Sequence, residues 1–547
     1  MELDTHILLQ FLIATLVYAA FLKLSSWGYL INLCLTLLYS LILLDPIPGL
    51  SQSVETILVI ILPNLLSNTI LYALIEPNEG NAVQRKYRVK FSLSKGRLSV
   101  GNVRKGVSII GAAGSGKTES VVYNFLKHFS SYSFCGVIHD YKNFELTELA
   151  YPLFKKGKIP FFIISFDKIY NRVNPIAPRY LCDEESVNEI SRVLLENLLE
   201  QKDSQLSSTT RFFNDAAEGL IAGLIWKLKT DYSEICSLPH LIALYQYLDT
   251  ENLVKFLSSD ITAKAMADAF ISGIDSDRQT AAVKSTLSNA FKKISTQRIF
   301  MALSADEVPL DINHCKNPAV VSIVNNPKYE SAYSPAIAAI LHTITKQMSI
   351  RNREASFLLM EEAPTIRLLH MHRIPATLRS YDIATVYVMQ DKVQNELLYG
   401  EKASKAVLSN LSYQFFGKVN DPDTAKYYER FFEIVKRKSI STSQSESLNF
   451  DTRITKSERE VSKVRADLFF RLSPGEFVSI SDGKDQFVKF KHQPLERGLP
   501  TKFQGYTHKE IKKNFERIYS EVEEIISKGL QPDGSLTNIE SHNKTPF

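Results

Sequence analysis

The fold class of this chain is decided by one short stretch, Gly111-Ala112-Ala113-Gly114-Ser115-Gly116-Lys117-Thr118. It fits G-x-x-x-x-G-K-[ST], the P-loop pattern, in which the glycines let backbone N–H groups point at phosphate oxygens. Lys117 is expected to reach the β- and γ-phosphates, and Thr118 to ligate Mg²⁺. All residues of the stretch are therefore predicted to bind ATP or GTP.

The flanks of the P-loop agree with this interpretation. Residues 107–110 are an apolar run typical of a buried strand, and residues 119–129 have helical spacing. The start of such a helix adds a positive dipole end near the phosphates. A chance match to the pattern rarely brings both a strand and a helix.

Further apolar runs predict an α/β domain with a doubly wound sheet. Ligands of such sheets lie beyond the carboxyl ends of the strands. Asp140 ends one predicted strand, so Asp140 and the nearby Lys142 are expected to lie toward the nucleotide. The predicted strands after the P-loop cover 134–140, 161–166, 319–324, 356–360, 384–390 and 413–419.

Two acids, Glu361 and Glu362, follow the strand predicted at 356–360. An apolar strand that ends in acids is the Walker B layout, in which the first acid supports Mg²⁺ and the second acts as general base toward water. Glu361 therefore joins Thr118 as a predicted metal ligand, and Glu362 is the predicted base. The first position is usually Asp, and Glu361 is one methylene longer, which still allows coordination through water.

Gln390 ends the strand predicted at 384–390. A polar side chain at this place can sense the γ-phosphate or orient water, and a strand-end hydrogen bond to the backbone is the alternative. With this residue, the predicted catalytic set comprises Lys117, Glu361, Glu362 and Gln390.

The pattern changes between the two halves of the α/β domain. From about Cys182 to Thr296, strand-like runs are absent and apolar residues recur at helical spacing. We predict an all-helical domain at 182–299, inserted into a nucleotide-binding domain formed by 85–181 and 300–495.

The C-terminal part holds a hairpin signal and a polar segment. Residues 477–481 and 486–490 flank Asp482-Gly483, which predicts a hairpin that closes the sheet. Residues 439–463 are rich in Ser and Thr and predict a flexible insertion. Residues 496–547 predict a C-terminal helix, at about 508–528, and a polar tail.

Three apolar stretches precede the P-loop, at 6–22, 27–44 and about 54–75. The third is about 22 residues long, enough to cross about 30 Å of hydrocarbon. Residues 1–80 are therefore predicted to be a transmembrane anchor of about three helices. Two spans remain open if residues 1–23 lie along the interface, and a buried helical bundle is the alternative outside the membrane.

Basic residues crowd the segment after the third stretch, and by the positive-inside rule that side is cytoplasmic. They are Arg85, Lys86, Arg88, Lys90, Lys95, Arg97, Arg104 and Lys105. The nucleotide site is therefore expected to face the cytoplasm, where ATP is available.

Composition adds two weaker signals. The net charge is +5, yet residues 1–80 carry Lys23 against six acids, so the basic excess lies in the rest of the chain. That excess suits a polyanionic partner or an anionic membrane surface. The five cysteines are scattered without a C-x-x-C pair, which indicates reduced thiols rather than a disulfide framework or a metal site.

These features, in this order, resemble the type IV coupling proteins, the TraG/TraD-like ATPases of conjugation, and in particular mobilisation-type members from Bacteroidetes. The resemblance covers about residues 85–495. Two more motifs carry it, Asp140-Tyr141-Lys142-Asn143-Phe144-Glu145 and Phe416-Gly417-Lys418-Val419-Asn420-Asp421.

The sequence departs from the family where Asp-Pro-Lys-Gly-Glu is frequent. Here Tyr141 and Asn143 replace two of those residues, and Phe144 is added. A second departure is Glu361 at the first Walker B position. Both departures bear on the roles of Asp140 and Lys142 more than on the class of the protein.

The resemblance implies a RecA-like P-loop NTPase fold with an inserted all-α domain, anchored by transmembrane helices in the inner membrane. It implies an ATPase that couples a relaxase–DNA complex to a type IV secretion channel and drives conjugative DNA transfer. The implied cofactors are ATP and Mg²⁺. The implied partners are single-stranded DNA and relaxase (the relaxosome), channel components, the membrane and further copies in a homo-hexamer.

A motor ring needs an arginine from a neighbouring subunit and basic side chains toward DNA. Candidates for the arginine are Arg367, Arg373 and Arg379, with surface or ion-pairing roles as the alternative. Candidates for DNA contact are Lys284, Lys292, Lys293 and Arg298, with a solvated helix face as the alternative.

Two further functions stay open at this point. One is a platform that recruits protein substrates, in which nucleotide controls assembly more than translocation. The other is a DNA pump of the FtsK/HerA type, although the large helical insertion between the Walker motifs favours the coupling class.

Overall fold

The computed structural model describes Cys34 and residues 84–200, 207–444, 452–501 and 505–529. Apart from Cys34, the stretches predicted to span the membrane lie outside these residues, as does the polar tail from residue 530. Within the described ranges, no helix combines the length and the apolar character needed to cross a membrane. The compact unit Tyr87–Phe547 is described below.

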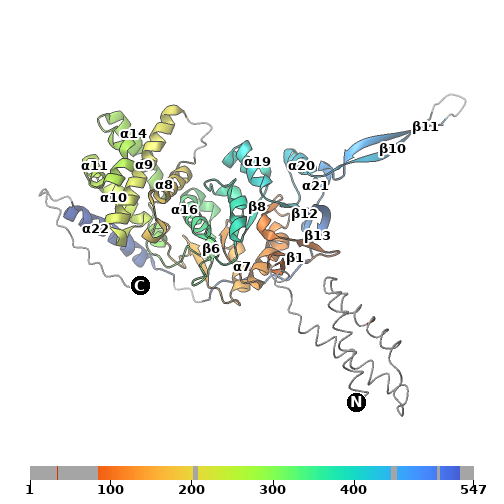
Figure 1. Cartoon of the computed structure of the whole chain (residues 1–547), viewed down its shortest axis with the longest axis horizontal. Coiled ribbons are helices and arrows are strands. Elements are labelled where there is room, and N and C mark those ends of the chain that lie inside the picture. The colour runs from red at the N-terminus through yellow and green to blue at the C-terminus, as the bar shows by residue number, and fades with distance from the viewer. Residues whose placement is uncertain (1–33, 35–83, 201–206, 445–451, 502–504, 530–547) are drawn as a thin grey trace, which may run out of the picture. The chain divides into compact units, whose positions relative to one another are not determined.

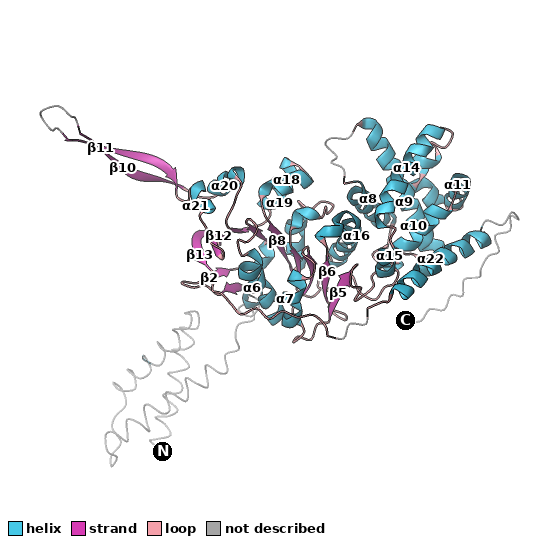
Figure 2. Ribbon diagram, turned by 180° about the vertical axis from the view of Figure 1, so that it is seen from behind, coloured by secondary structure: helices cyan, strands magenta, loops and turns pink. Residues whose placement is uncertain are grey.

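A nine-stranded mixed sheet forms the centre of this unit (Figures 1 and 2). Every predicted strand is present, although β9 ends at Phe416 rather than at residue 419. At one edge, β12 pairs antiparallel with both of its neighbours, β13 and β9, and all other neighbours pair parallel. In spatial order the strands are β13 (Lys484–Lys489), β12 (Glu476–Ser481), β9 (Tyr413–Phe416), β3 (Val107–Ile110), β8 (Ile383–Met389), β7 (Ser356–Met360), β4 (Cys135–Asp140), β6 (Val320–Val324) and β5 (Phe161–Ser165).

The order of the strands in the sheet determines which loops come together at the candidate site. β3 and β4 follow each other in sequence, but β8 and β7 lie between them in the sheet. Ligands of open α/β sheets bind where the strand order reverses, beyond the carboxyl ends. The loops after β3, β8, β7 and β4 therefore meet at one edge.

Both faces of the sheet are buried, which accounts for the nearly continuous apolar strands. Along β7, Phe357 and Leu359 enter one core and Leu358 and Met360 enter the other. The helices around the sheet are α6 (Tyr123–Ser131), α7 (Glu145–Phe154), α16 (Glu330–Met348), α17 (Ile374–Leu378), α18 (Lys392–Tyr399), α19 (Glu401–Ser409), α20 (Pro422–Glu429) and α21 (Ala466–Phe470). Of these, α6 and α7 pack on the first core, and α16, α19 and α20 on the second.

Between β5 and β6 the described chain forms helices and no strands (Figure 1). This helical segment shares one apolar core with the adjacent face of the sheet. Its limits as a separate domain, predicted at 182 and 299, stay a prediction. Its α-helices are α8 (Glu184–Leu199), α9 (Ser208–Asp231), α10 (Leu238–Tyr247), α11 (Thr250–Ser258), α12 (Ile261–Met266), α13 (Asp268–Ile271), α14 (Asp277–Ile294) and α15 (Gln297–Leu303).

One helix expected in this segment, at 263–274, is broken. α12 ends at Met266 and α13 begins at Asp268. At the break the Met266 carbonyl approaches α9 so closely that a Cβ at Gly219 would lie 2.4 Å from its oxygen. Tight packing against a glycine therefore interrupts a periodicity that reads as continuous in the sequence.

The C-terminal helix α22 (His508–Gly529) packs against α10 and α15 of the helical segment. The rings of Phe300 and Phe515 lie 5.0 Å apart, and His240 Nε2 lies 2.9 Å from Glu521 Oε2. Ile518 of α22 is fully buried. The helix predicted at about 508–528 is thus present and belongs to the packed core.

Two of the described hairpins, β12–β13 and β10–β11, differ in whether they join the central sheet. β12 and β13 join through Asp482-Gly483, both with positive φ, as a two-residue turn requires, and β12 closes the sheet onto β9, as predicted. The flexible insertion predicted at 439–463 is wrong for the part of it that the structure describes, because β10 (Ile434–Gln444) and β11 (Thr452–Ser462) pair antiparallel along their whole lengths. Its Thr, Ile and Val residues favour strands, a preference masked by the Ser-rich composition. A further small sheet pairs β1 (Val89–Phe91) with β2 (Leu98–Val100).

The β10–β11 hairpin is expected to be dispensable for folding, because among the described strands it pairs only with itself and extends away from the sheet (Figure 1). Replacing residues 436–460 by Asn-Gly joins Val435 to its register partner Val461. The melting temperature should stay within about 2 °C of wild type. Ile518→Ala, which opens a cavity in the core, should lower it by about 5 °C or more. A comparable loss in the hairpin deletion would contradict this prediction.

Candidate nucleotide-binding site

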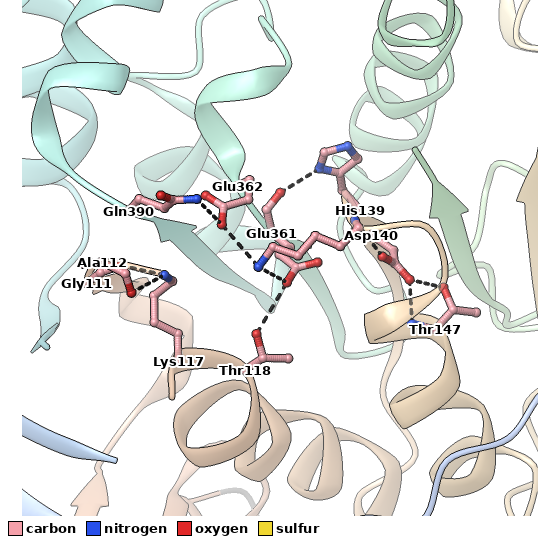
Figure 3. Close-up of polar contacts among 11 residues, drawn as sticks. Gly111, Ala112, Lys117, Thr118, His139, Asp140, Thr147, Glu361, Glu362 and Gln390 are labelled. Carbon is pink, nitrogen blue, oxygen red and sulfur yellow. Dashed lines mark hydrogen bonds and ion pairs between the residues drawn. The ribbon is translucent and has the colours of Figure 1, made fainter. Parts of the chain in front are cut away.

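The P-loop Gly111–Thr118 leaves β3 and curls over the carboxyl edge of the sheet (Figure 3). Gly116 has φ +85°, a left-handed conformation, and a Cβ there would lie 2.8 Å from the backbone nitrogen of Gly475. The N–H of Gly475 donates to the Ser115 carbonyl at 2.9 Å. Glycine is therefore required at position 116 both by backbone conformation and by the close approach of the chain before β12.

The helix after the P-loop begins differently from expectation. Residues Lys117–Val122 form a π-helix, η3, and the α-helix starts only at Tyr123. The N–H of Tyr123 donates to the carbonyl of Thr118. π-helical turns are rare and occur frequently at functional sites, where they change the direction of a side chain.

Lys117 is buried and points at its own loop. Its Nζ donates to the Gly111 carbonyl at 2.5 Å and to the Ala112 carbonyl at 3.3 Å. Burial lowers the pKa of this ammonium, and the Glu362 carboxylate opposes that effect. The lysine therefore lies beside the loop's backbone groups, where it can exchange carbonyl oxygens for phosphate oxygens.

The acid pair lies directly after β7, and both side chains are buried. The N–H of Glu361 donates to the His139 carbonyl at 3.1 Å, and His139 Nδ1 donates to the Glu361 carbonyl at 2.9 Å. Burial lowers the pKa of His139 to about 4, so its ring is neutral at pH 7. Glu362 has φ +44°, which is strained for a residue with a side chain.

Two predicted metal ligands come together here. Thr118 Oγ1 donates to Glu361 Oε1 at 3.4 Å, and Glu361 Oε2 is buried without a hydrogen-bond partner among the described residues. A hydroxyl and a carboxylate fit Mg²⁺, which uses few protein oxygens together with substrate phosphates. Within the described ranges, no cluster of three His, Cys, Asp or Glu could hold a metal alone.

Gln390, the residue directly after β8, joins the same group. Its Nε2 donates to Glu362 Oε1 at 3.1 Å, so its described partner is a carboxylate rather than the backbone considered in the alternative. The structure thus brings together Lys117, Glu361, Glu362 and Gln390 from three adjacent strands (Figure 3).

Asp140 and Lys142, both expected to lie toward the nucleotide, differ in the groups that their side chains contact. Asp140 is fully buried, and its Oδ2 accepts hydrogen bonds from the N–H (2.7 Å) and the hydroxyl (2.5 Å) of Thr147. Burial raises the pKa of Asp140 to about 6. Lys142 reaches the acid pair, with Nζ 3.6 Å from Glu361 Oε1 and 3.4 Å from Glu362 Oε1.

His139 and Thr147 are the residues of this site that sequence reasoning missed. His139 lies in β4, where it reads as a strand residue, and Thr147 lies in α7. Neither the buried run of β4 nor the helical spacing of α7 gives a signal for the role of these residues. Only the pairing of β4 with β7 and the packing of α7 reveal what they contact.

Most of the basic candidates are engaged within the chain. Arg367 pairs with Glu196 at 3.1 Å, and Lys293 donates to the Leu198 carbonyl at 2.6 Å. Arg298 lies 3.6 Å from Asp167, and Lys284 donates to Thr250. Exposed side chains remain at Lys292, Arg373 and Arg379.

A cavity of about 660 Å³ opens beside the acid pair. Its lining includes Glu362 and Gln390 of the site together with Glu196, Glu330 and Arg367. A smaller hollow of about 400 Å³ borders the P-loop at Ala112 and Ala113 and reaches Asn420 and Asp421. Gln390 lines both cavities, and each has space for a small ligand.

Comparisons with known proteins identify a family and a fold for this chain. Residues 69–495 match the family described as "Type IV secretory system Conjugative DNA transfer". No curated protein sequence matches the chain. An unbound structure of the bacterial conjugative coupling protein TrwBdeltaN70 has TM-score 0.60 and 12% identity, covering 78% of this chain and 94% of that one.

Two further structures of the plasmid coupling protein TrwB are similar. One, with the non-hydrolysable ATP analogue ADPNP, has TM-score 0.57 and 12% identity and covers 74% of this chain and 89% of that one. The other, with ADP and Mg²⁺, has TM-score 0.56 and 12% identity and covers 72% and 86%. These likenesses show a common α/β fold with a large mixed sheet.

The buried acid should make the fold sensitive to pH. Burial, together with the charge of Asp140, raises the pKa of Glu361 from 4.5 to about 8. The folded state therefore favours the protonated acid, and this contribution to stability is full below pH 4.5 and lost as the pH rises through 8. Without Mg²⁺, Glu361→Gln should raise the melting temperature by about 3 °C at pH 8.5 and by less than about 1 °C at pH 4.5.

Thermal unfolding followed by circular dichroism checks this expectation. Glu234→Gln, the same change at an exposed position, is the control and should show no such pH dependence. Equal stability of wild type and Glu361→Gln at pH 8.5 would contradict the raised pKa.

Proposed function

This chain belongs to the type IV secretory system family of conjugative DNA transfer proteins, and from that premise we propose that it is an ATPase motor. Its work is to couple a relaxase–DNA complex to a type IV secretion channel and to drive DNA transfer.

One observation carries the proposal: the P-loop lysine and hydroxyl, the acid pair and a strand-end amide converge at one edge of the sheet. The Thr118 hydroxyl donates a hydrogen bond to Glu361, and the Gln390 amide donates one to Glu362. Phosphoryl transfer asks the protein mainly for positioning and electrostatic stabilisation, and this set supplies both.

Each residue has a role that follows from its contacts. Lys117 and the N–H groups of the P-loop bind the phosphate oxygens. Thr118 and Glu361 would hold Mg²⁺, which neutralises developing charge on those oxygens. Glu362 accepts the proton of the attacking water, and Gln390 holds its carboxylate in place.

The wider architecture is proposed from sequence and likeness together. The fold similarity to TrwB, reported with an ATP analogue and with ADP and Mg²⁺, supports a RecA-like nucleotide-binding domain that uses ATP and Mg²⁺. The apolar stretches within residues 1–80 and the basic residues after them support an inner-membrane anchor with the site in the cytoplasm.

Single-stranded DNA, relaxase and channel components are the proposed partners, in keeping with the family. A homo-hexamer is the proposed assembly, because a ring would let a neighbouring subunit supply an arginine that stabilises the charge of the transition state. The exposed Arg373 and Arg379 remain candidates for that role.

ATP hydrolysis by the full-length protein in detergent, with and without single-stranded DNA, tests the motor. Lys117→Ala should reduce hydrolysis at least about 100-fold and abolish DNA transfer in cells. Lys127→Ala, on the exposed side of α6, is the control and should behave as wild type. If DNA leaves hydrolysis unchanged and Lys117→Ala still transfers DNA, the motor is excluded and a recruiting platform remains.

The general base has its own test. Glu362→Gln keeps the size of the side chain and removes the base, so it should bind ATP with about the affinity of wild type and hydrolyse it about 100-fold more slowly or worse. Fluorescent-nucleotide titration and single-turnover hydrolysis measure the two effects. Near-normal turnover would remove Glu362 from this role.

A further inference from the structure

Lys142 contacts the acid pair, but none of the roles proposed above for the site involves it. Its ammonium lies 3.6 Å from Glu361 Oε1 and 3.4 Å from Glu362 Oε1. These oxygens are also the ones that Thr118 and Gln390 contact. One lysine therefore contacts both halves of the acid pair.

The backbone of Lys142 is held firmly. Its N–H donates to Asp140 Oδ1 at 3.2 Å, and the same carboxylate accepts two hydrogen bonds from Thr147. The Thr147 hydroxyl also lies 2.8 Å from Ser322 Oγ of β6. The buried Asp140 thus fastens the loop after β4 to both α7 and β6.

The two residues after Lys142 complete this fastening. Asn143 and Phe144 have φ +49° and +76°, left-handed values that are unusual for residues with side chains. The N–H of Asn143 donates to the Asn325 carbonyl at 3.1 Å, and the ring of Phe144 is buried beside Ile163 and Val324. The strained loop persists because hydrogen bonds and packing hold it on both sides.

The side chain of Lys142 differs from its backbone. It is 35% exposed, whereas the side chains of Glu361 and Glu362 are each 3% exposed. A long, flexible stem at the edge of the site lets the ammonium move while its Cα stays in place.

We propose that Lys142 is a positioning residue that competes with Mg²⁺ for Glu361 and passes to Glu362 alone when the metal binds. This inference rests on the proposed nucleotide site. Glu361 Oε1 contacts both Lys142 Nζ and Thr118 Oγ1, so a cation held by Thr118 and Glu361 would lie beside the carboxylate that the ammonium contacts. An ammonium and a divalent cation at the same carboxylate repel each other, and this repulsion is stronger in a partly buried site than in water.

The competition has a consequence for the general base. When the ammonium leaves Glu361, its contact with Glu362 Oε1 remains, beside the hydrogen bond from Gln390. Both then hold the same oxygen of Glu362 and leave its other oxygen to water. Metal binding is thereby coupled to the placement of the base.

The test is the binding of Mn²⁺, a paramagnetic substitute for Mg²⁺, to the full chain in detergent, measured by electron paramagnetic resonance without nucleotide. Lys142→Met keeps the stem and removes the charge, so Mn²⁺ should bind at least about tenfold tighter than to wild type. Lys142→Gln, a second neutral variant, should show the same gain. Lys142→Arg keeps the charge and should stay within about threefold of wild type.

Lys156→Met is the matched control, because Lys156 pairs with Glu496 at 3.1 Å on the exposed surface, far along the chain from the acid pair. It should bind Mn²⁺ as wild type does. Unchanged or weaker binding in both neutral Lys142 variants, with melting temperatures near that of wild type, overturns the inference. A gain in Lys142→Arg equal to that in Lys142→Met also overturns it.

Failure of the proposed function would look different. If wild type binds Mn²⁺ neither alone nor with a non-hydrolysable ATP analogue, the metal site itself is wrong and both proposals fall. If wild type binds Mn²⁺ with the analogue and hydrolyses ATP, but the neutral variants show no gain, only the competition is wrong.

Discussion

Two adjacent carboxylates buried at the end of one strand are the constraint on which this structure depends. Glu361 and Glu362 are each 2% exposed, and burial of such charges is costly unless other groups compensate for them. Lys142, Thr118 and Gln390 supply part of that compensation with an ammonium, a hydroxyl and an amide, and the pKa of Glu361 stays raised by burial. Each of these groups comes from a different loop, so the acid pair holds together the edge of the sheet.

The sheet order makes this convergence possible. β7, which ends in the acid pair, lies between β8 and β4, and β3 lies beyond β8. Parallel strands place their carboxyl ends at one edge, where Gln390, Lys142 and the P-loop meet the acids. The backbone of Glu361 is itself tied to His139 of β4 in both directions. Local strain at Glu362, Asn143 and Phe144 lies in the same region, as is common where function and not stability selects the conformation.

The helical segment and the hairpins show which elements local sequence patterns predict and which they miss. The apolar period predicted the helices between β5 and β6, and Asp482-Gly483 predicted the turn between β12 and β13, because both signals depend on neighbours in the chain. The break between Met266 and Asp268 and the β10–β11 hairpin were not predicted. The first arises from packing against Gly219, and the second from strand pairing that a polar composition conceals.

The sequence by itself determined the α/β class, the P-loop, the acid pair and the strand-end Gln390, because motif spacing and apolar runs are local properties of the chain. Only the tertiary structure decided the strand order, the hydrogen bond from Thr147 to the buried Asp140, and the contact of Lys142 with both acids. Those contacts join residues far apart in sequence, such as Lys142 and Glu361. Their distances follow from sheet pairing and side-chain packing, which no local pattern encodes.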